Sequence, residues 1–543
     1  MKPSKTVLLF ATLAILANAP LAQAQLPSAP LGFFPPAFFE DQQIMADFVA
    51  DRAAAIRLGK ALFWDMQVGS DGIQACASCH FHAGADPRLT NQLSPGLLGG
   101  DQIFGNPDFP QFGPNYTLVP EDFPLHDRTL QDDQEAPVLR DVNDVVSSQG
   151  VVFSQFVDIV PGFAVDLTSP LVDPVFQVNG ANVRRVEPRN TPTVINAVFN
   201  HDNFWDGRAK NIFNGVNPFG HLDPEAAVLD NVTGTLGEVT VRIENASLAS
   251  QAVGPPLSEF EMSAAGRTFA KIGKKMLSLP PLAGQRVHPN DSVLGPIANI
   301  AAGKGLTVSY EQLIMDAFRP RWWNSARIVT FQIIDDYYNA PTATDPDGYM
   351  FGNGIPTILP PPGRPLTTDE FTQMEANFSL FFGLAIQLYE STLVGANTRF
   401  DSFLAGNQAA LTEQEQRGLG TFLGKGSCIA CHVGSALTAA SILVIQGLEN
   451  PEEAEGGIEF MGMAEGTAFY DTGFYNISVR PTADDIGRGD ITPTTNPLTG
   501  LGFPISMTGL GLLQRDGLLP PEVNQFTQPL PAGEPDPPGR AAR

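Results

Sequence analysis

The four cysteines of this 543-residue chain constrain its fold more than any other feature, because they occur as two copies of one short motif. The first copy reads Cys76-Ala-Ser-Cys79-His80 and the second reads Cys428-Ile-Ala-Cys431-His432. Two thiols three positions apart on a helical turn point the same way, and the next residue adds an imidazole beside them. No cysteine remains for a disulfide, so we expect the fold to be stable without one.

Cys-x-x-Cys-His is the attachment pattern of c-type haem. The two thiols form thioethers with one porphyrin, and the histidine becomes the proximal ligand of its iron. A zinc half-site and a thioredoxin-like redox pair are the competing interpretations. Zinc would need two further ligands at each site, and a redox pair would not need a histidine in both copies. We therefore expect two covalently attached c-type haems, with His80 and His432 as iron ligands.

Residues 1–24 have the pattern of an export signal. Two lysines precede an apolar run over residues 7–16, and Ala22-Gln23-Ala24 offers a cleavage site. The run is shorter than the roughly 20 residues that span a bilayer, so a retained membrane anchor is the less favoured interpretation. We expect a signal peptide, a periplasmic mature protein and no membrane span.

The formal net charge is −26 at neutral pH. Such an acidic chain is not a basic nucleic-acid binder, because phosphate backbones attract positive charge. The same charge favours a partner protein with a basic docking face, and it makes the rate of association depend on salt.

Each haem motif follows a predicted helix. Asp51 can cap the helix before the first motif, and Thr412 with Glu415 forms a capping box ahead of the second. The repeat of helix, loop and motif indicates a duplicated cytochrome c-like unit. We therefore predict a mainly α fold of two cytochrome c-like haem modules, with long loop-rich and small β insertions.

The predicted domains follow from this repeat. An N-terminal haem domain would occupy residues 40–395, and a C-terminal cytochrome c domain residues 396–515. A Pro-rich tail follows at 516–543. Two insertions interrupt the first domain, at 84–185 and at 217–250, where Pro, Gly and polar residues replace the helical pattern.

Three further elements are expected inside the N-terminal domain. Short strands are predicted around residues 151–157, and alternating apolar residues over 234–243 predict a hairpin. Thr367 and Glu370 have the spacing of a capping box at the start of a longer helix. The apolar residues that follow at steps of three and four indicate core packing.

Three blocks of sequence accompany the haem motifs. Arg189-Asn-Thr-Pro-Thr-Val-Ile-Asn-Ala-Val-Phe-Asn200 precedes Asn203-Phe-Trp-Asp-Gly-Arg-Ala209, and Gly254-Pro-Pro-Leu-Ser-Glu-Phe-Glu-Met-Ser263 lies further on. Together with the motifs, these blocks resemble the bacterial di-haem cytochrome c peroxidase family, with its related quinone-cofactor-maturing enzymes. The likeness covers roughly half of the mature chain, in blocks separated by insertions.

The resemblance implies roles for the matching residues. His80 would hold the peroxidatic haem and His432 the electron-transfer haem, and Trp205 matches the tryptophan that conducts electrons between the two. The neighbouring Asp206 and Arg208 are most simply interpreted as a structural ion pair.

The resemblance also implies an acid–base site and a metal site. Glu261 matches the distal carboxylate and Gln251 its accompanying glutamine, while Asn190 matches a ligand of an interdomain calcium ion. A carboxylate held over an iron with an open position can move a proton between the oxygens of H2O2. From the residues alone, however, Glu259 is as eligible as Glu261.

Two parts of the chain depart from the family pattern. Many members have a histidine shortly before the Arg-Asn-x-Pro block, but residues 175–187 contain none. Either His126 takes that position or the iron has an open site, and we favour the open site. Beyond the second motif a Pro-rich segment replaces the family's route to a distal Met or Tyr. Met507, Met461 and Met463 are candidate substitute ligands, but ordinary packing is the favoured interpretation of each.

The sequence therefore predicts a periplasmic di-haem c-type peroxidase that reduces H2O2 with electrons from a small redox protein, a cytochrome c or a cupredoxin. Two alternatives stay open. One is a di-haem oxidase of a protein or organic substrate, and the other is a non-enzymatic electron-transfer cytochrome. The sequence does not predict the oligomeric state.

Overall fold

The computed structural model describes residues 27, 29–36, 42–82, 86–96, 102–105, 112–332, 354–475, 491–495, 502–504 and 508, apart from short gaps at 131–132, 134, 221–222, 224–225, 233, 452–453, 455 and 464–465. The predicted signal peptide, the Pro-rich tail and Met507 lie outside these residues, as do the side chains of Met461 and Met463. No helix within the described ranges has the length and apolar character needed to cross a membrane.

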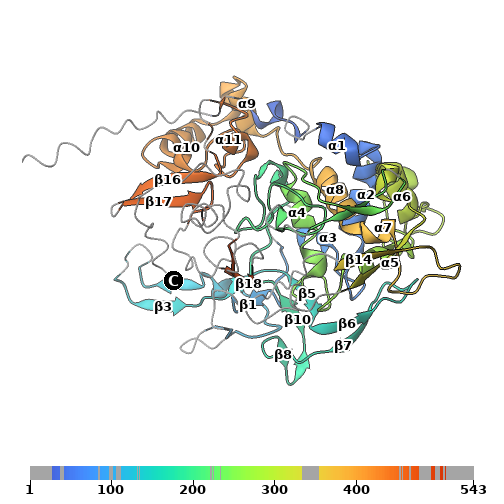
Figure 1. Cartoon of the computed structure of the whole chain (residues 1–543). Helices are drawn as coiled ribbons and strands as arrows, with labels where there is room; N and C mark the ends of the chain where they lie inside the picture. The colour runs from blue at the N-terminus through green and yellow to red at the C-terminus, as the bar shows by residue number, and fades with distance from the viewer. Residues whose placement is uncertain are drawn as a thin grey trace, which may run out of the picture.

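The helices are short, and most belong to one half of the molecule (Figure 1). They are α1 (Gln42–Phe48), α2 (Arg52–Trp64), α3 (Cys76–His80), α4 (Ser247–Ala252), α5 (Phe269–Leu277), α6 (Tyr310–Ala317), α7 (Gln373–Ala376), α8 (Phe378–Glu390), α9 (Arg399–Leu404), α10 (Glu413–Leu423) and α11 (Ile442–Ile445).

The strands form hairpins rather than one sheet. They are β1 (Leu93–Ser94), β2 (His126–Arg128), β3 (Val138–Asp141), β4 (Val145–Val146), β5 (Gln149–Val152), β6 (Ser154–Asp158), β7 (Leu167–Pro170), β8 (Gln177–Val178), β9 (Ala181–Asn182), β10 (Arg184–Val186), β11 (Val228–Asp230), β12 (Gly237–Val239), β13 (Ile328–Gln332), β14 (Ile355–Leu359), β15 (Phe371–Thr372), β16 (Ile458–Met463), β17 (Gly466–Asp471), β18 (Ile491–Thr495) and β19 (Gly502–Pro504). Each sheet of the described residues has two strands, except β14–β13–β15, which has three. The pairings in the three-stranded sheet are antiparallel, as in the others.

The prediction of a mainly α fold is wrong. About 30% of the well-placed residues are helical and 17% lie in strands, in many small sheets. The helical period governs the apolar core and the segments before the haem motifs, whereas the insertion at 84–185 builds the hairpins from β2 to β10. The strands expected near 151–157 are present as β5 and β6. The predicted hairpin is β11–β12, in which Val228 pairs with Val239.

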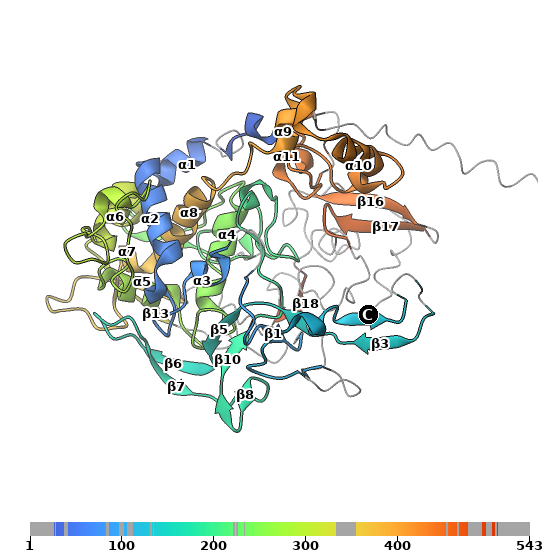
Figure 2. The ribbon, with the colours of Figure 1, turned by 180° about the vertical axis from the view of Figure 1, so that it is seen from behind.

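The core lies where α2 crosses α8, with α4, α5 and α6 around this pair (Figures 1 and 2). Asp51 caps α2 as predicted, because its carboxylate accepts a hydrogen bond from Ala54 N at 3.0 Å. At the crossing, a Cβ on Gly59 would lie 1.8 Å from the carbonyl oxygen of Ala385. The glycine therefore allows the two backbones to approach each other closely.

The capping box predicted at Thr367 and Glu370 is wrong. Those two residues form a turn, in which Thr367 N donates to the Glu370 carboxylate at 2.9 Å, and the chain then enters β15. The true box is five residues further on, where Thr372 N donates to Glu375 Oε2 at 2.7 Å and the Thr372 hydroxyl accepts from Glu375 N. Pairing of Phe371 in β15 delays the helix, because those backbone groups already bond to β13.

The second haem motif belongs to a separate group of elements, α9 to α11 with β16–β17, which both views place away from the α2–α8 core (Figures 1 and 2). The chain before residue 40 packs on this group: Leu31 N donates to Asp401 Oδ1, and the Ser435 hydroxyl donates to Ala29 O at 2.7 Å. The two halves also meet where His201 N donates to Ala440 O at 2.8 Å. The domain boundaries themselves stay a prediction.

Candidate functional site

The first haem motif forms helix α3, which presents two thiols and an imidazole. The Ser78 hydroxyl accepts a hydrogen bond from Ala75 N at 2.9 Å and so closes the start of the helix. The His80 Nδ1 atom lies 2.9 Å from the carbonyl oxygen of Pro192. Because a carbonyl can only accept, Nδ1 carries the proton and Nε2 is left for a metal. Burial lowers the pKa of His80, which favours the neutral imidazole that binds iron, so this donor set fits a c-type haem.

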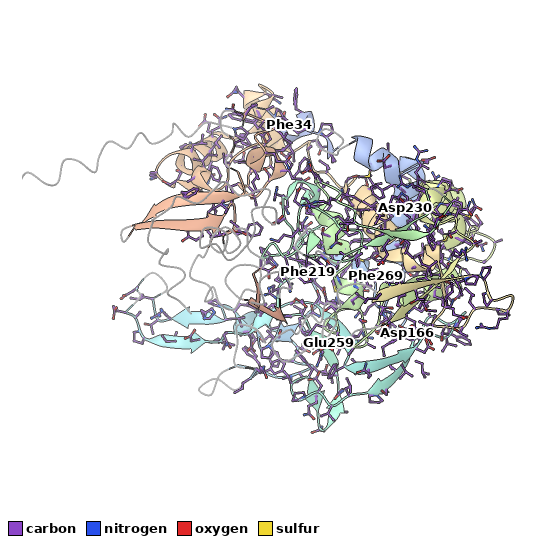
Figure 3. The ribbon with its side chains drawn as sticks, viewed as in Figure 1. Phe34, Asp166, Phe219, Asp230, Glu259 and Phe269 are labelled. Carbon is purple, nitrogen blue, oxygen red and sulfur yellow. The ribbon has the colours of Figure 1, made fainter. Side chains whose placement is uncertain are left out.

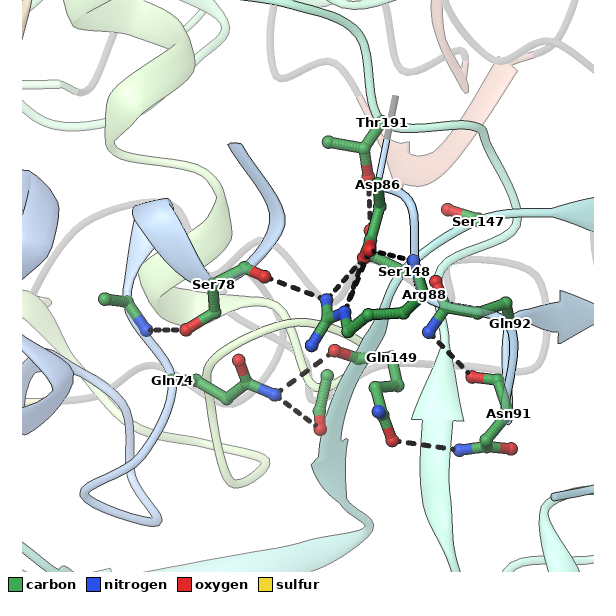
Figure 4. Close-up of polar contacts among 12 residues, drawn as sticks. Gln74, Ser78, Asp86, Arg88, Asn91, Gln92, Ser147, Ser148, Gln149 and Thr191 are labelled. Carbon is green, nitrogen blue, oxygen red and sulfur yellow. Dashed lines mark hydrogen bonds and ion pairs between the residues drawn. The ribbon is translucent and has the colours of Figure 1, made fainter. Parts of the chain in front are cut away.

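Polar residues of the insertion connect this helix with the Arg189–Asn200 block (Figure 4). Arg88 donates to Ser78 O at 2.8 Å and pairs through Nε with Asp86 at 2.9 Å. Asp86 accepts from the Ser148 hydroxyl at 2.8 Å, and the Thr191 hydroxyl donates to Ser148 at 2.9 Å. Thr191 directly precedes Pro192, whose carbonyl accepts from His80. The insertion therefore contacts the motif helix at Ser78 and also the chain segment that holds His80.

The second motif begins as a single 3-10 turn, Cys428–Ala430, rather than an α-helix. The His432 Nδ1 atom lies 3.2 Å from Leu437 O, so Nε2 is again available. The capping box of α10 is confirmed, since Thr412 N donates to Glu415 Oε2 at 2.7 Å. None of the residues of α10 is buried, and its Phe422 ring centroid lies 6.0 Å from that of His432. The Phe422 ring of this uncovered helix therefore fits against a large flat apolar group held at the motif.

The structure distinguishes the two glutamates that the sequence left as equal candidates. The Glu259 carboxylate is buried and pairs with Arg185 Nη1 at 2.6 Å. Glu261 lies in the turn that follows Ser258, and the next residue, Met262, accepts a backbone hydrogen bond from Ser70 N at 2.9 Å, six residues before the first haem motif. The pKa of the Cys79 thiol is raised to about 12, first by burial and then by the negative charge of Glu261. The negative charge of Glu261 therefore raises the pKa of Cys79 in the first motif, whereas Glu259 is part of an ion pair.

Burial raises the pKa of Glu261 to about 7, against a hydrogen bond from Ser258 and the charges of Arg208 and Arg189, which lower it. A carboxyl group with this pKa can both take up and release a proton near neutral pH. Glu261 therefore has the chemistry expected of an acid–base residue.

Glu187 is a site residue that the sequence did not reveal. Its pKa is raised to about 8, first by burial and then by the negative charge of Glu261. The sequence feature that points to Glu187 is its position at the end of residues 175–187, the stretch in which many family members have a histidine and this chain has none. His126 does not lie in this buried group, because its ring is exposed and contacts Asp141 at 2.7 Å in the β2–β3 hairpin.

The predicted ion pair between Asp206 and Arg208 is confirmed. Arg208 Nε donates to Asp206 Oδ1 at 3.1 Å, and both side chains are buried. Arg189 Nη2 lies 3.6 Å from the other oxygen of Asp206. One carboxylate therefore holds both of the guanidinium groups whose charges act on Glu261.

The roles of the other predicted site residues, Trp205, Asn190 and Gln251, stay predictions. Trp205 is 59% exposed, so it is not a core aromatic, and its indole N–H donates to Asn190 O at 2.6 Å. Asn190 Nδ2 donates to Val146 O, and the described residues contain no cluster of three His, Cys, Asp or Glu side chains that could hold a metal ion. Gln251 is half-buried on the last turn of α4, without a hydrogen bond to Glu261.

Comparisons with known proteins agree with these observations. Residues 53–110 and 167–283 match the family model described as di-haem cytochrome c peroxidase. The matched segments contain the first haem motif, the three sequence blocks and Glu261, while most of the insertion and the second motif lie outside them.

Similar proteins carry related names. A cytochrome c551 peroxidase of Pseudomonas aeruginosa is 27% identical over 247 residues, which are 46% of this chain and 37% of that protein. The cytochrome-c peroxidase IdrP2 of Denitromonas iodatirespirans is 42% identical over 64 residues, 12% of this chain and 17% of that protein. IdrP1 of the same organism is 40% identical over 73 residues, 13% of this chain and 19% of that protein. Each match spans well under half the length of the relative.

Proposed function

From the premise that this chain is a member of the di-haem cytochrome c peroxidase family over residues 53–110 and 167–283, we propose that it reduces H2O2 to water with electrons from a small redox protein. The observation that carries the proposal is the position of Glu261. Glu261 packs against Gly150, whose carbonyl accepts from Gln74 just before the first haem motif, and burial raises the pKa of Glu261 to about 7, while Glu259 is engaged by Arg185.

The reaction consumes two electrons and two protons for each H2O2 and yields two molecules of water. Cys76, Cys79 and His80 would hold the haem, which when bound would supply the redox-active iron for cleavage of the O–O bond. Glu261 accepts a proton from one oxygen of H2O2 and gives it to the other oxygen, which leaves as water. Arg189 and Arg208 stabilise negative charge at the same place, since their guanidinium groups act on Glu261.

Electrons would enter at the haem of Cys428, Cys431 and His432 and pass by Trp205. The exposed indole, held by Asn190 O, supports this role, because it is not packed into the core of its own domain. The net charge of −26 supports a donor with a basic face, either a cytochrome c or a cupredoxin. The name of the relative from Pseudomonas aeruginosa supports a cytochrome c.

The export pattern of residues 1–24 supports a periplasmic location, where c-type haems and small redox proteins would meet. Asn190 is proposed as a calcium ligand on the family resemblance alone.

The proposal is tested with the protein carrying both haems, mixed with H2O2 and a reduced cytochrome c. We expect oxidation of the donor, and we expect Glu261→Gln to slow it by about 100- to 10,000-fold, the usual contribution of an acid–base residue. Glu311→Gln, an exposed carboxylate on α6, is the control and keeps the wild-type rate. Unchanged turnover in Glu261→Gln would refute the assignment. No oxidation of a cytochrome c or a cupredoxin would favour an electron-transfer cytochrome.

A further inference from the structure

Arg185, at the centre of β10, lies in a buried cluster next to the candidate site. Its Nε donates to Asp173 Oδ2 at 2.7 Å and its Nη1 to Glu259 Oε1 at 2.6 Å. The guanidinium also lies between two rings, 3.5 Å from the centroid of Phe153 and 4.4 Å from that of Phe260. All the polar groups of this cluster are less than 10% exposed, so these contacts form at low dielectric, where they are strong.

Two of these contacts are with the residues directly before Glu261. Arg185 bonds to the carboxylate of Glu259 and stacks on the ring of Phe260. The turn itself is tight, because the amides of Glu261, Met262 and Ser263 all lie within hydrogen-bond distance of Ser258 O. Fixing the side chains of Glu259 and Phe260 in such a turn restrains the backbone from which the Glu261 side chain projects.

The insertion also sets the backbone of this turn. A Cβ on Gly150 of β5 would lie 1.9 Å from Phe260 O and 2.6 Å from the Cα of Glu261. The same Gly150 carbonyl accepts from Gln74 at 2.9 Å and from Arg184 at 2.6 Å. The strand therefore lies against the turn. Gln74, two residues before the first haem motif, donates a hydrogen bond to the same strand.

We propose that Arg185 is a positioning residue, which holds Glu259 and Phe260 so that Glu261 is directed at the first haem motif. This inference rests on the proposed peroxidase function for its catalytic consequence. It assigns a part in the reaction to the C-terminal end of the insertion, where Asp173 and Arg185 lie, within the segment 167–283 that the family model matches.

The first test is a double-mutant cycle on the protein with both haems. Arg185→Lys keeps the charge but loses the planar fork and the stacking, and we expect it to slow the reaction with H2O2 by about 10- to 100-fold through misplacement of Glu261. In a Glu261→Gln background the same substitution should have no further effect, because it acts through Glu261. A loss that persists in that background, or a wild-type rate in Arg185→Lys, would overturn the proposal.

A second variant guards against misfolding of Arg185→Lys. Asp173→Asn keeps the Oδ1 that accepts from Val175 N and Phe176 N, and removes only the oxygen that accepts from Arg185 Nε. We expect a smaller loss of rate, again absent in the Glu261→Gln background. A loss of rate that persists in the Glu261→Gln background, or a wild-type rate in Asp173→Asn, would count against the proposal.

The third readout does not use activity. The infrared carboxyl band that disappears in Glu261→Gln should titrate with a different midpoint in Arg185→Lys. Arg321→Lys is the matched control, since Arg321 pairs with Asp230 at 3.0 Å and lies 4.6 Å from the Trp322 ring, and Figure 3 places Asp230 well away from Glu259. An unmoved midpoint in Arg185→Lys would refute the positioning role. If Glu261→Gln had wild-type turnover, the proposed function would be wrong. The infrared midpoint would still show whether Arg185 positions Glu261.

Discussion

The imidazole of His80 and the carbonyl oxygen of Pro192 are 2.9 Å apart, although 112 residues separate them in the chain. This contact joins the first haem motif to the Arg189–Asn200 block. It selects the ring nitrogen that faces the metal, because the protonated Nδ1 cannot be a ligand. The block therefore lies beside the first haem motif, and the positive charge of Arg189 also lowers the pKa of Glu261.

The rate of peroxide reduction should depend on pH through Glu261. Its raised pKa of about 7 means that the carboxyl is protonated below pH 7 and cannot accept a proton there. We expect the second-order rate constant with H2O2 to rise about tenfold per pH unit below pH 7 and to level off above it. Stopped-flow measurements from pH 5 to 9 test this. Absence of the inflexion in wild type, or its survival in Glu261→Gln, would contradict the assignment.

Trp205→Phe should slow the oxidation of the donor several-fold and leave thermal stability nearly unchanged, because the indole is 59% exposed. The measurement is turnover with reduced cytochrome c at saturating H2O2. Trp323→Phe is the matched control, since its indole N–H also donates to a backbone carbonyl, that of Phe318 at 3.0 Å, outside the site. Equal rates in the two variants would remove Trp205 from the electron path.

The parts of the site that the sequence predicted correctly are local. The caps Asp51 and Thr412 and the pair Asp206–Arg208 involve residues at most a few positions apart, so their spacing indicates their geometry directly. Glu261 came from the resemblance. Its distinction from Glu259 depends on Arg185, 74 residues away, and no local pattern records that contact.

The errors in the fold have the same origin. Thr367 and Glu370 have the spacing of a capping box, but β15 pairs with β13, some 40 residues earlier in the chain, and postpones the helix to Gln373. The mainly α prediction took the insertion at 84–185 to be rich in loops, with short strands only around residues 151–157. The insertion instead satisfies its backbone groups in short hairpins, which its frequent turn residues permit.

Asp166→Asn should strongly destabilise the fold. The carboxylate is buried and pairs with two buried cations, Arg267 Nη1 at 2.9 Å and Lys275 Nζ at 2.9 Å. Removing its charge leaves both cations in a low-dielectric interior, at a cost of about 3–5 kcal/mol. Thermal unfolding of the protein with both haems measures the loss. Asp369→Asn breaks a pair with Lys271 that is 81% exposed on the Asp369 side and should cost less than about 1 kcal/mol. Equal effects would contradict this account.

Glu390 should make stability fall as pH rises. It lies buried at the end of α8, and burial raises its pKa to about 8. The folded protein therefore keeps this proton to about pH 8, whereas the unfolded chain releases it near pH 4.5, so the folded state loses relative stability across that interval and not below it. The change amounts to about 4–5 kcal/mol for a shift of this size. Glu390→Gln, which cannot ionise, should unfold at a higher temperature than wild type at pH 8, and the difference should shrink towards pH 4.5. A difference between the two proteins that is the same at both pH values would show that Glu390 is already ionised in the folded state.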